Sequence, residues 1–354
     1  MKKELLMASA LASTLGAASV AEAVTSTMSG NHRVGVEFDS PNGTAVDTNA
    51  VIEQSSFAVS LSEVTDGGTT ISSSFNLANE ADGLSNATAL TLEFTDGSKL
   101  DIFNAGNASG THDISIPGSA GEEGAAVTTT SNAPSGIDFT QGATELGIEW
   151  NSASDFMMDG FKMSASFSTD SGAAAGATAT ADSSWGIGGT YVTDMGDAAV
   201  TIGAGLAAVD YVNTGTALTN DKGGFHVGIS ATQEDLTVAV GHGSGDTIVD
   251  DGASTALANT QVDGSATKAG IKYVSGDLTF NLGVVSGEAK DSDTQGTAGT
   301  TDDAYDKTSA SVSYAAAAGV TAIIGYTTVD LQDEGGSVTD SGGSAWYIGA
   351  NLAF

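Results

Sequence analysis

Apolar residues recur at every second position in short segments along the whole chain, and this period-two pattern constrains the fold more than any other feature. It is clear at residues 33–38, 90–94, 146–150, 225–229 and 346–354. Because successive side chains of a strand point to opposite faces, each segment predicts a strand with one apolar face. About sixteen such segments are near the roughly 9–11 residues that a tilted membrane-spanning strand needs, so the sequence predicts an all-β antiparallel sheet.

The connections between these segments alternate between short turns and long polar stretches. Short turns are predicted at residues 95–98, 193–197, 233–235, 275–277 and 318–319. Long polar connections are predicted near residues 39–50, 78–86, 104–142, 170–182, 211–221, 244–264, 287–306 and 331–343. Every long connection follows an odd-numbered strand, as an up-and-down barrel with one elaborated rim requires. A sandwich needs no such parity, and a solenoid would show a fixed repeat period, which this sequence lacks.

Aromatic residues fall at the ends of the predicted strands, where membrane barrels place rings at the level of the lipid headgroups. The rings expected next to the long connections are Phe38, Phe57, Phe167, Trp185, Phe225 and Trp346. The rings expected next to the short turns are Phe94, Trp150, Phe161, Tyr191, Tyr273, Phe280 and Phe354. Two aromatic girdles are the simplest interpretation, and the alternative is an ordinary sandwich core, whose rings would gather in the strand middles.

The N-terminus has the three regions of a secretory signal peptide. Lys2 and Lys3 precede a mostly apolar stretch at residues 5–20, and Ala21-Glu22-Ala23 is a small-residue cleavage signature. We therefore expect a signal peptide at residues 1–23 and a single mature domain at residues 24–354. No apolar run of about 18 residues follows, so the mature chain is predicted to be either soluble outside the inner membrane or a β-barrel in an outer membrane.

Composition excludes several functional classes. Lys and Arg number 10 against 44 Asp and Glu, a net charge of −34, which argues against nucleic-acid binding. The chain has no Cys, which excludes thiol catalysis and cysteine-zinc sites. His residues at positions 32, 112, 226 and 242 have no metal-protease spacing, and Gly203-Ala204-Gly205 and Gly241-His242-Gly243 are interpreted as small strand residues. We therefore do not expect an enzyme.

The start and the end of the mature chain carry a resemblance to a known family. Residues 28–36, the closing strand that ends in Phe354 and the long third connection from Asn104 to Gly142 resemble the general porins of alphaproteobacterial type. The resemblance implies a sixteen-stranded homotrimer in the outer membrane of a Gram-negative bacterium, with the third loop folded into the lumen. It also implies passive diffusion of small hydrophilic solutes, and recognition of the terminal aromatic by the barrel-assembly machinery.

Charged residues of opposite parity to the apolar set are predicted to line an aqueous lumen, because a barrel of this width leaves a channel. The predicted wall residues are Arg33, Glu37, Glu93, Lys99, Asp101, Glu145, Glu149, Lys162, Lys268 and Lys272. The third connection adds His112 and the constriction candidates Asp113, Glu122, Glu123 and Asp138. In the resembling family an acidic loop faces a basic wall, but Arg33 is the only Arg here. We therefore expect a cation preference, while solvation on an outer loop is the alternative for each charge.

The acidic connections allow two further interpretations. Asp291 with Asp293, and Asp302 with Asp303, are weak Ca²⁺ candidates, since they lack the spacing of an EF-hand, and plain solvated loops are the alternative. No cofactor is otherwise expected. The expected surroundings are outer-membrane lipid and lipopolysaccharide, to which divalent ions could bridge the loops. The alternative function is that of a secreted, acidic, β-rich surface or adhesin-like structural protein.

Overall fold

The computed structural model describes residues 24–41, 47–78, 84–87, 90–103, 107–118, 146–169, 179–213, 222–250, 259–289, 303–332 and 341–354. The expected signal peptide lies outside these residues, as do parts of every long connection. Within the described part of the chain, no helix is long and apolar enough to cross a membrane.

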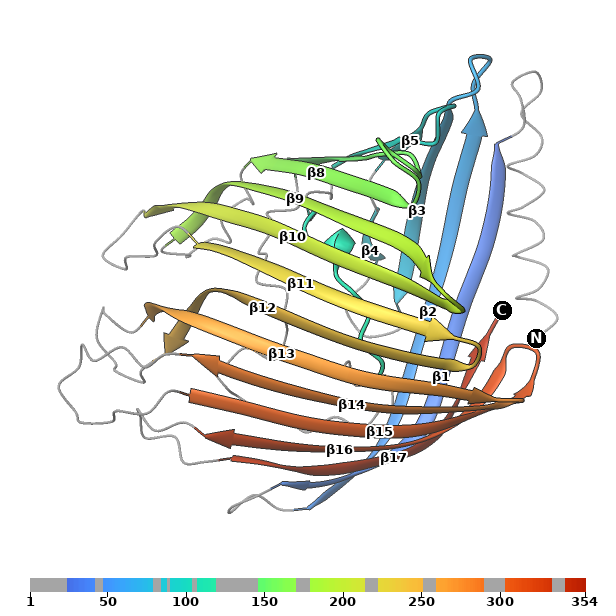
Figure 1. Cartoon of the computed structure of the whole chain (residues 1–354). Coiled ribbons are helices and arrows are strands. Elements are labelled where there is room, and N and C mark those ends of the chain that lie inside the picture. The colour runs from blue at the N-terminus through green and yellow to red at the C-terminus, as the bar shows by residue number, and fades with distance from the viewer. Residues whose placement is uncertain are drawn as a thin grey trace.

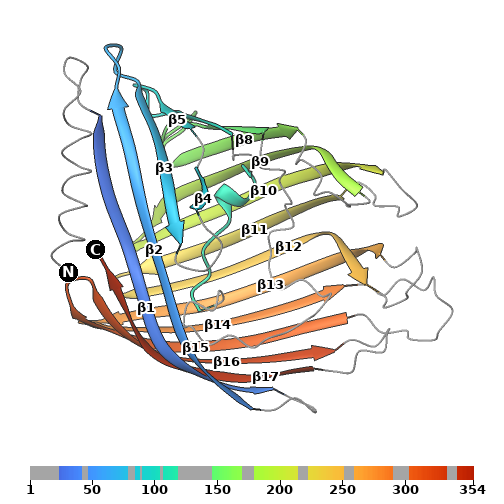
Figure 2. The same ribbon diagram turned by 180° about the vertical axis from the view of Figure 1, so that it is seen from behind.

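The described strands form one closed, antiparallel, up-and-down sheet (Figures 1 and 2). The strands are β1 (Thr25–Pro41), β2 (Thr48–Val64), β3 (Thr70–Ala78), β4 (Leu84–Ala87), β5 (Leu90–Glu93), β6 (Lys99–Ile102), β7 (Leu146–Asn151), β8 (Phe161–Thr169), β9 (Ala179–Met195), β10 (Ala198–Asn213), β11 (Lys222–Gln233), β12 (Leu236–Asp250), β13 (Asn259–Ser275), β14 (Leu278–Ala289), β15 (Asp303–Ala317), β16 (Val320–Gln332) and β17 (Ser341–Ala353). Strand β1 pairs with β2 on one side and with β17 on the other, which closes the barrel.

Strands β4 and β5 occupy one position in the sheet between them. Both pair with β3, and β5 then pairs with β6. The barrel therefore has sixteen strand positions, which confirms the predicted fold class.

The five short turns predicted from the sequence all lie at one rim of the barrel, and their backbones explain their composition. Gly97 has a φ of 84° and Gly319 a φ of 73°, a region that glycine enters without steric cost. Glu234 takes the same region at φ 51°. A Cβ at position 319 would also lie 2.3 Å from the Ala353 carbonyl oxygen. This turn therefore needs glycine both for its φ angle and for lack of space.

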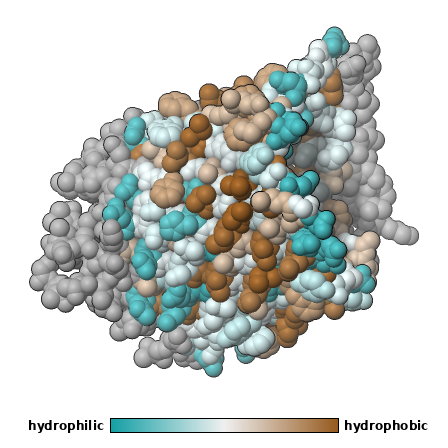
Figure 3. Space-filling model, in the orientation of Figure 1, coloured by the Kyte–Doolittle hydropathy of each residue, from teal (hydrophilic) through white to brown (hydrophobic). Residues whose placement is uncertain are grey.

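The two faces of the sheet separate apolar from polar side chains, as the alternation predicts. On β1, Val34, Val36 and Phe38 are 40%, 38% and 43% exposed on the outside, while Gly35 and Glu37 are buried on the inside. Figure 3 shows the same separation on a wider scale, with apolar side chains gathered over the middle of the outer face. An outer face of this kind suits lipid rather than water.

Aromatic residues mark both edges of this apolar face. Phe38 pairs with Trp346 toward the long connections, and the Tyr273 and Phe280 rings lie 6.5 Å apart near the short turns. The prediction for Phe57 is wrong, because its ring lies 6.4 Å from that of Phe354, at the short-turn edge. Its strand, β2, begins at Thr48, several residues before the alternation becomes visible, so Phe57 lies farther from the long connection than expected.

Candidate functional site

The described part of the third connection, residues 107–118, lies against the inner wall of the barrel. It contains a short 3₁₀ helix, η1 (Gly110–His112), which is seen inside the ring of strands in Figures 1 and 2. Ala108 and Ser109 are fully buried there. Ile114 and Ile116 are nearly so, and they pack with Ala239 of β12. We call residues 107–118 the inner segment.

Glycines on the wall let the backbone of the inner segment approach the strands closely. A Cβ added at each of these positions would lie 2.0–2.8 Å from an atom of the inner segment, which is closer than real side chains come. The positions are Gly188 on β9, Gly203 and Gly205 on β10, Gly228 on β11 and Gly270 on β13. The sequence analysis gave Gly203 and Gly205 no role. The signal that could have found them is glycine on the inner parity of neighbouring strands.

Hydrogen bonds fix the inner segment to β7 and β8. The Thr111 hydroxyl donates to Glu149 Oε1 at 2.8 Å, and the Ala108 amide donates to Ser166 Oγ at 3.0 Å. Glu149 is only 8% exposed, so this wall carboxylate serves as an anchor as well as a charge.

His112 is held by hydroxyl groups on both of its ring nitrogens. Nδ1 lies 2.6 Å from Thr190 Oγ1 and Nε2 lies 2.8 Å from Ser164 Oγ. Burial lowers the pKa of His112 below its ordinary value, and the charges of His226 and Lys162 lower it further. The neutral imidazole is therefore the favoured form.

His226 fixes the same segment from β11. Its side chain is fully buried, and Nε2 donates to the Ser109 carbonyl oxygen at 2.9 Å. Its other nitrogen, Nδ1, faces Asp113 Oδ1 at 3.9 Å. Asp113 is the constriction candidate that the structure describes, and it lies on the inner segment as the sequence analysis expects. Glu122, Glu123 and Asp138 lie outside the described residues.

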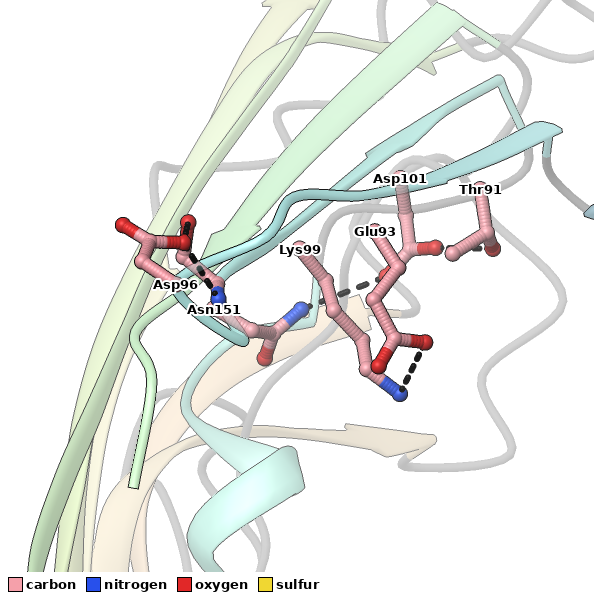
Figure 4. A network of polar contacts seen from close by, with 7 residues as sticks. Thr91, Glu93, Asp96, Lys99, Asp101 and Asn151 are labelled. Atoms are coloured by element: carbon pink, nitrogen blue, oxygen red, sulfur yellow. Dashed lines mark hydrogen bonds and ion pairs between the residues drawn. The ribbon is translucent and has the colours of Figure 1, made fainter. Parts of the chain in front are cut away.

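The predicted wall residues that the structure describes all lie on the inner face. Glu145 lies outside the described residues. Lys99, Asp101 and Glu93 form a polar network with Thr91 and Asn151 (Figure 4). Lys99 Nζ lies 3.4 Å from Glu93 Oε2, while Asp101 accepts hydrogen bonds from the Thr91 hydroxyl and from Asn151 Nδ2. Most charges of this wall therefore have a fixed partner.

Arg33 is held over an aromatic ring where β1 meets β17. Its guanidinium lies 4.6 Å from the Tyr347 ring centroid, and its Nε donates to the Tyr347 hydroxyl at 3.3 Å. Tyr347 is fully buried and covers two glycines, because a Cβ at Gly35 or Gly349 would meet its ring or hydroxyl at 2.5 and 2.2 Å. Tyr347 was not predicted, because parity gives the face of a side chain and not its contacts.

In the described part of the chain, positive charge lies on the inside of the barrel. Every Lys and Arg side chain that the structure describes lies on the inner parity: Arg33, Lys99, Lys162, Lys268, Lys272 and Lys307. Lys307 was not predicted. Carboxylates share that face, but many lie elsewhere, in particular along the short turns: Asp66, Asp96, Asp155, Asp159, Asp194, Asp197, Glu234, Asp235 and Asp277. The lumen is therefore of mixed charge, and the short-turn mouth is acidic.

The remaining candidates concern metal ions and the terminal aromatic. Asp291, Asp293 and Asp302 lie outside the described residues, as does the side chain of Asp303. The described residues hold no group of three or more His, Asp or Glu placed to bind a metal ion. Calcium binding by these loops stays a prediction. Phe354 exchanges two backbone hydrogen bonds of 3.0 Å with Gly30, and its ring is 73% exposed on the outside.

Comparison with solved structures finds the same architecture in several proteins. A solved porin matches over 93% of this chain and 100% of its own, with a TM-score of 0.63 and 18% identity. An anion-selective porin from Comamonas acidovorans matches over 94% and 100%, with a TM-score of 0.60 and 13% identity. OmpT, an outer membrane protein of Vibrio cholerae in a trimer form, matches over 94% and 100%, with a TM-score of 0.61 and 14% identity. No protein-family model and no curated protein matches the chain.

Proposed function

Because the chain has the porin fold, we propose that it forms a water-filled channel for passive diffusion of ions and small hydrophilic solutes across the outer membrane of a Gram-negative bacterium. One observation carries this proposal. The barrel is apolar outside and charged inside, with the inner segment seated across the wall. Charges on the inner parity are tolerable only where water or a partner solvates them. A channel, rather than an enzyme or a surface adhesin, uses this arrangement.

A cation preference is the finer part of the proposal, and the acidic mouth supports it. The short turns carry carboxylates at one entrance, and a mouth of one charge sign concentrates counter-ions there. Inside, Lys99 is paired with Glu93, and Asp113 lies on the inner segment. Since lysines also line the wall, we expect the preference to be weak to moderate.

We further propose a homotrimer, because part of the outer face does not suit lipid. Glu53 is exposed on β2 beside Val34, and His32 Nδ1 lies 2.7 Å from Ser55 Oγ on the same face. These polar groups lie between the levels of Phe38 and Phe57, within the apolar band. A Lys or Arg on the lipid face costs about 2–4 kcal/mol at the midplane, and a Glu costs less but still destabilises the barrel, so a second copy of the chain is the better cover for Glu53. The trimer form of the Vibrio cholerae protein agrees with this.

Planar-bilayer recording of the detergent-purified mature protein tests the proposal. We expect open single-channel steps in groups of three and a reversal potential on the cation side in a KCl gradient. An anion-side reversal would contradict the cation preference and leave the channel intact. Folded protein without conductance would contradict the channel itself, with heat-modifiable migration on a detergent gel as the control for folding. Assembly through Phe354, and contact with lipopolysaccharide, stay predictions.

A further inference from the structure

A cavity of about 840 Å³ lies on the short-turn side of the inner segment. The inner faces of β5 to β9 form its wall, and η1 contributes Thr111 and His112. Its size lies within the range of small-molecule sites, about 300–1,000 Å³. Apart from the aliphatic Val192 and two glycines, its lining is made of charged, hydroxyl, amide and imidazole side chains. Such a lining suits a hydrophilic solute rather than an apolar one.

The charges of this cavity are ordered from one side to the other. Glu93 on β5 pairs across the sheet with Lys99 on β6, which pairs with Asn151 on β7. Lys162 follows on β8. Neighbouring strands are about 4.8 Å apart, and Lys162 lies two residues along β8 from Ser164, the partner of Asn151, so the Glu93 and Lys162 backbones are separated by roughly 16 Å along the wall. The cavity therefore has a carboxylate end and an ammonium end.

The carboxylate end is fixed. Asp96 Oδ1 accepts hydrogen bonds from Ser98 Oγ at 2.7 Å and from the Ser98 amide at 2.9 Å (Figure 4). These two bonds lower the pKa of Asp96, so the group stays ionised. Glu93 lines the same cavity, and its carboxylate is shared with Lys99. A cationic group of a solute would meet the Asp96 carboxylate here.

At the ammonium end, the Lys162 side chain is the charged group that a solute can reach. Among the described residues, Lys162 makes no ion pair, and its side chain is exposed to the cavity. His112 beside it is occupied by two hydroxyl groups and stays neutral, so it does not compete for an anion. Thr190 pairs directly with Lys162 across the strands and adds a hydroxyl. An anionic group of a solute is the partner that Lys162 lacks.

We propose that this cavity binds small zwitterionic solutes, with the anionic group on Lys162 and the cationic group at the Glu93 and Asp96 end. The separation of the two ends favours zwitterions of short-peptide length over those whose charges are adjacent. The inference rests on the proposed channel function, and it makes the cavity a binding position on the solute path.

Current interruptions by triglycine test the inference. Single channels are recorded in 0.1 M KCl with triglycine added to either side, and N-acetyltriglycine and triglycine amide serve as the purely anionic and purely cationic probes. We expect triglycine to interrupt the current more than either probe. K162Q should weaken triglycine binding about three- to fivefold, the scale of one partly exposed ion pair, and D96N should weaken it in the same direction. K272Q removes the same charge from β13, outside the cavity, and should leave triglycine binding unchanged.

Three results would overturn the inference: no effect of triglycine, equal binding of N-acetyltriglycine, or equal loss in K162Q and K272Q. Calorimetric titration of triglycine into the detergent-folded protein makes the same comparison without a current. Loss of conductance with retained, Lys162-dependent binding would then contradict the channel proposal and not the binding site.

Discussion

The close contact between the wall glycines and the inner segment predicts that two added methyl groups will weaken the attachment of this segment. A Cβ at Gly203 would lie 2.2 Å from the His112 carbonyl oxygen, and one at Gly270 would lie 2.0 Å from that of Pro117. Both neighbours are backbone atoms, so the contact cannot be relieved by a change of side-chain rotamer. Overpacking of this kind costs about 1–3 kcal/mol per site.

This cost must be compared with the free energy that attaches the inner segment to the wall. Hydrogen bonds of Thr111, Ala108 and His112 contribute about 0.5–1.5 kcal/mol each. Burial of Ile114 and Ile116 adds about 1.5–3 kcal/mol each. One substitution should therefore weaken the attachment without releasing it. The double variant G203A/G270A doubles the cost, which then approaches the lower end of the attachment, so the segment should leave the wall in a larger fraction of molecules than in either single variant.

Single-channel conductance and the size of polyethylene glycol excluded from the pore measure this release. We expect both to rise in the double variant, with increased proteolysis near Ile114 in the detergent-folded protein. G223A is the matched control, since a Cβ there meets its neighbours at an ordinary 3.5 Å or more. A double variant with wild-type conductance, size exclusion and proteolysis, in a barrel that still migrates as folded on an unheated gel, would show that these glycines do not seat the inner segment.

Three further predictions concern other parts of the barrel. The folded-state pKa of His112 lies below its ordinary 6.5. The inner segment is therefore most stable above pH 6.5 and becomes less stable as the pH drops below it. Proteolysis near Ile114 should increase from pH 8 to pH 5, and H112Q should remove most of that increase. Y347A uncovers Gly35 and Gly349 and should destabilise the barrel by about 3–5 kcal/mol, measured as a lower temperature of the mobility shift on detergent gels; Y347F, which keeps the ring, should cost much less. E53R should dissociate the trimer while the monomer stays folded, as followed on native gels, and E234R on an exposed turn should leave the trimer intact; a stable E53R trimer would place the interface elsewhere.

Strand positions and turns could be predicted from this sequence because each depends on local chemistry. Alternation at residues 33–38 indicates a sheet with two different faces. Gly97 and Gly319 indicate turns whose positive φ angles only glycine adopts without strain. The error at Phe57 has the same origin. The first residues of β2 lie toward the long-connection rim, where polar Thr48 and Asn49 are followed by the apolar run 50–52 on both faces, so no period-two pattern marks the start of the strand.

The attachment of the inner segment could not be predicted because it depends on contacts between residues far apart in the chain. Ser109 meets His226 and Thr111 meets Glu149, and no local pattern links them. Glu149 was assigned to the wall from parity alone, which gives the face of a side chain and not its partner. Its carboxylate accepts a hydrogen bond from the inner segment, so part of the charge predicted for the wall holds the inner segment in place.

The net charge of the sequence is a poor guide to the charge of the lumen, because the lysines and the carboxylates are distributed differently over the barrel. The total of −34 counts every residue equally, whereas ion selectivity depends on the charges that a permeating ion approaches within about a Debye length, 8–10 Å at ordinary salt. The described lysines face inward, while Asp246, Asp306 and Asp330 face outward above the apolar band. An ion inside the barrel therefore meets far less negative charge than the sequence total suggests. The proposed cation preference consequently depends on the acidic mouth, and it should weaken as salt screens that mouth while conductance itself rises.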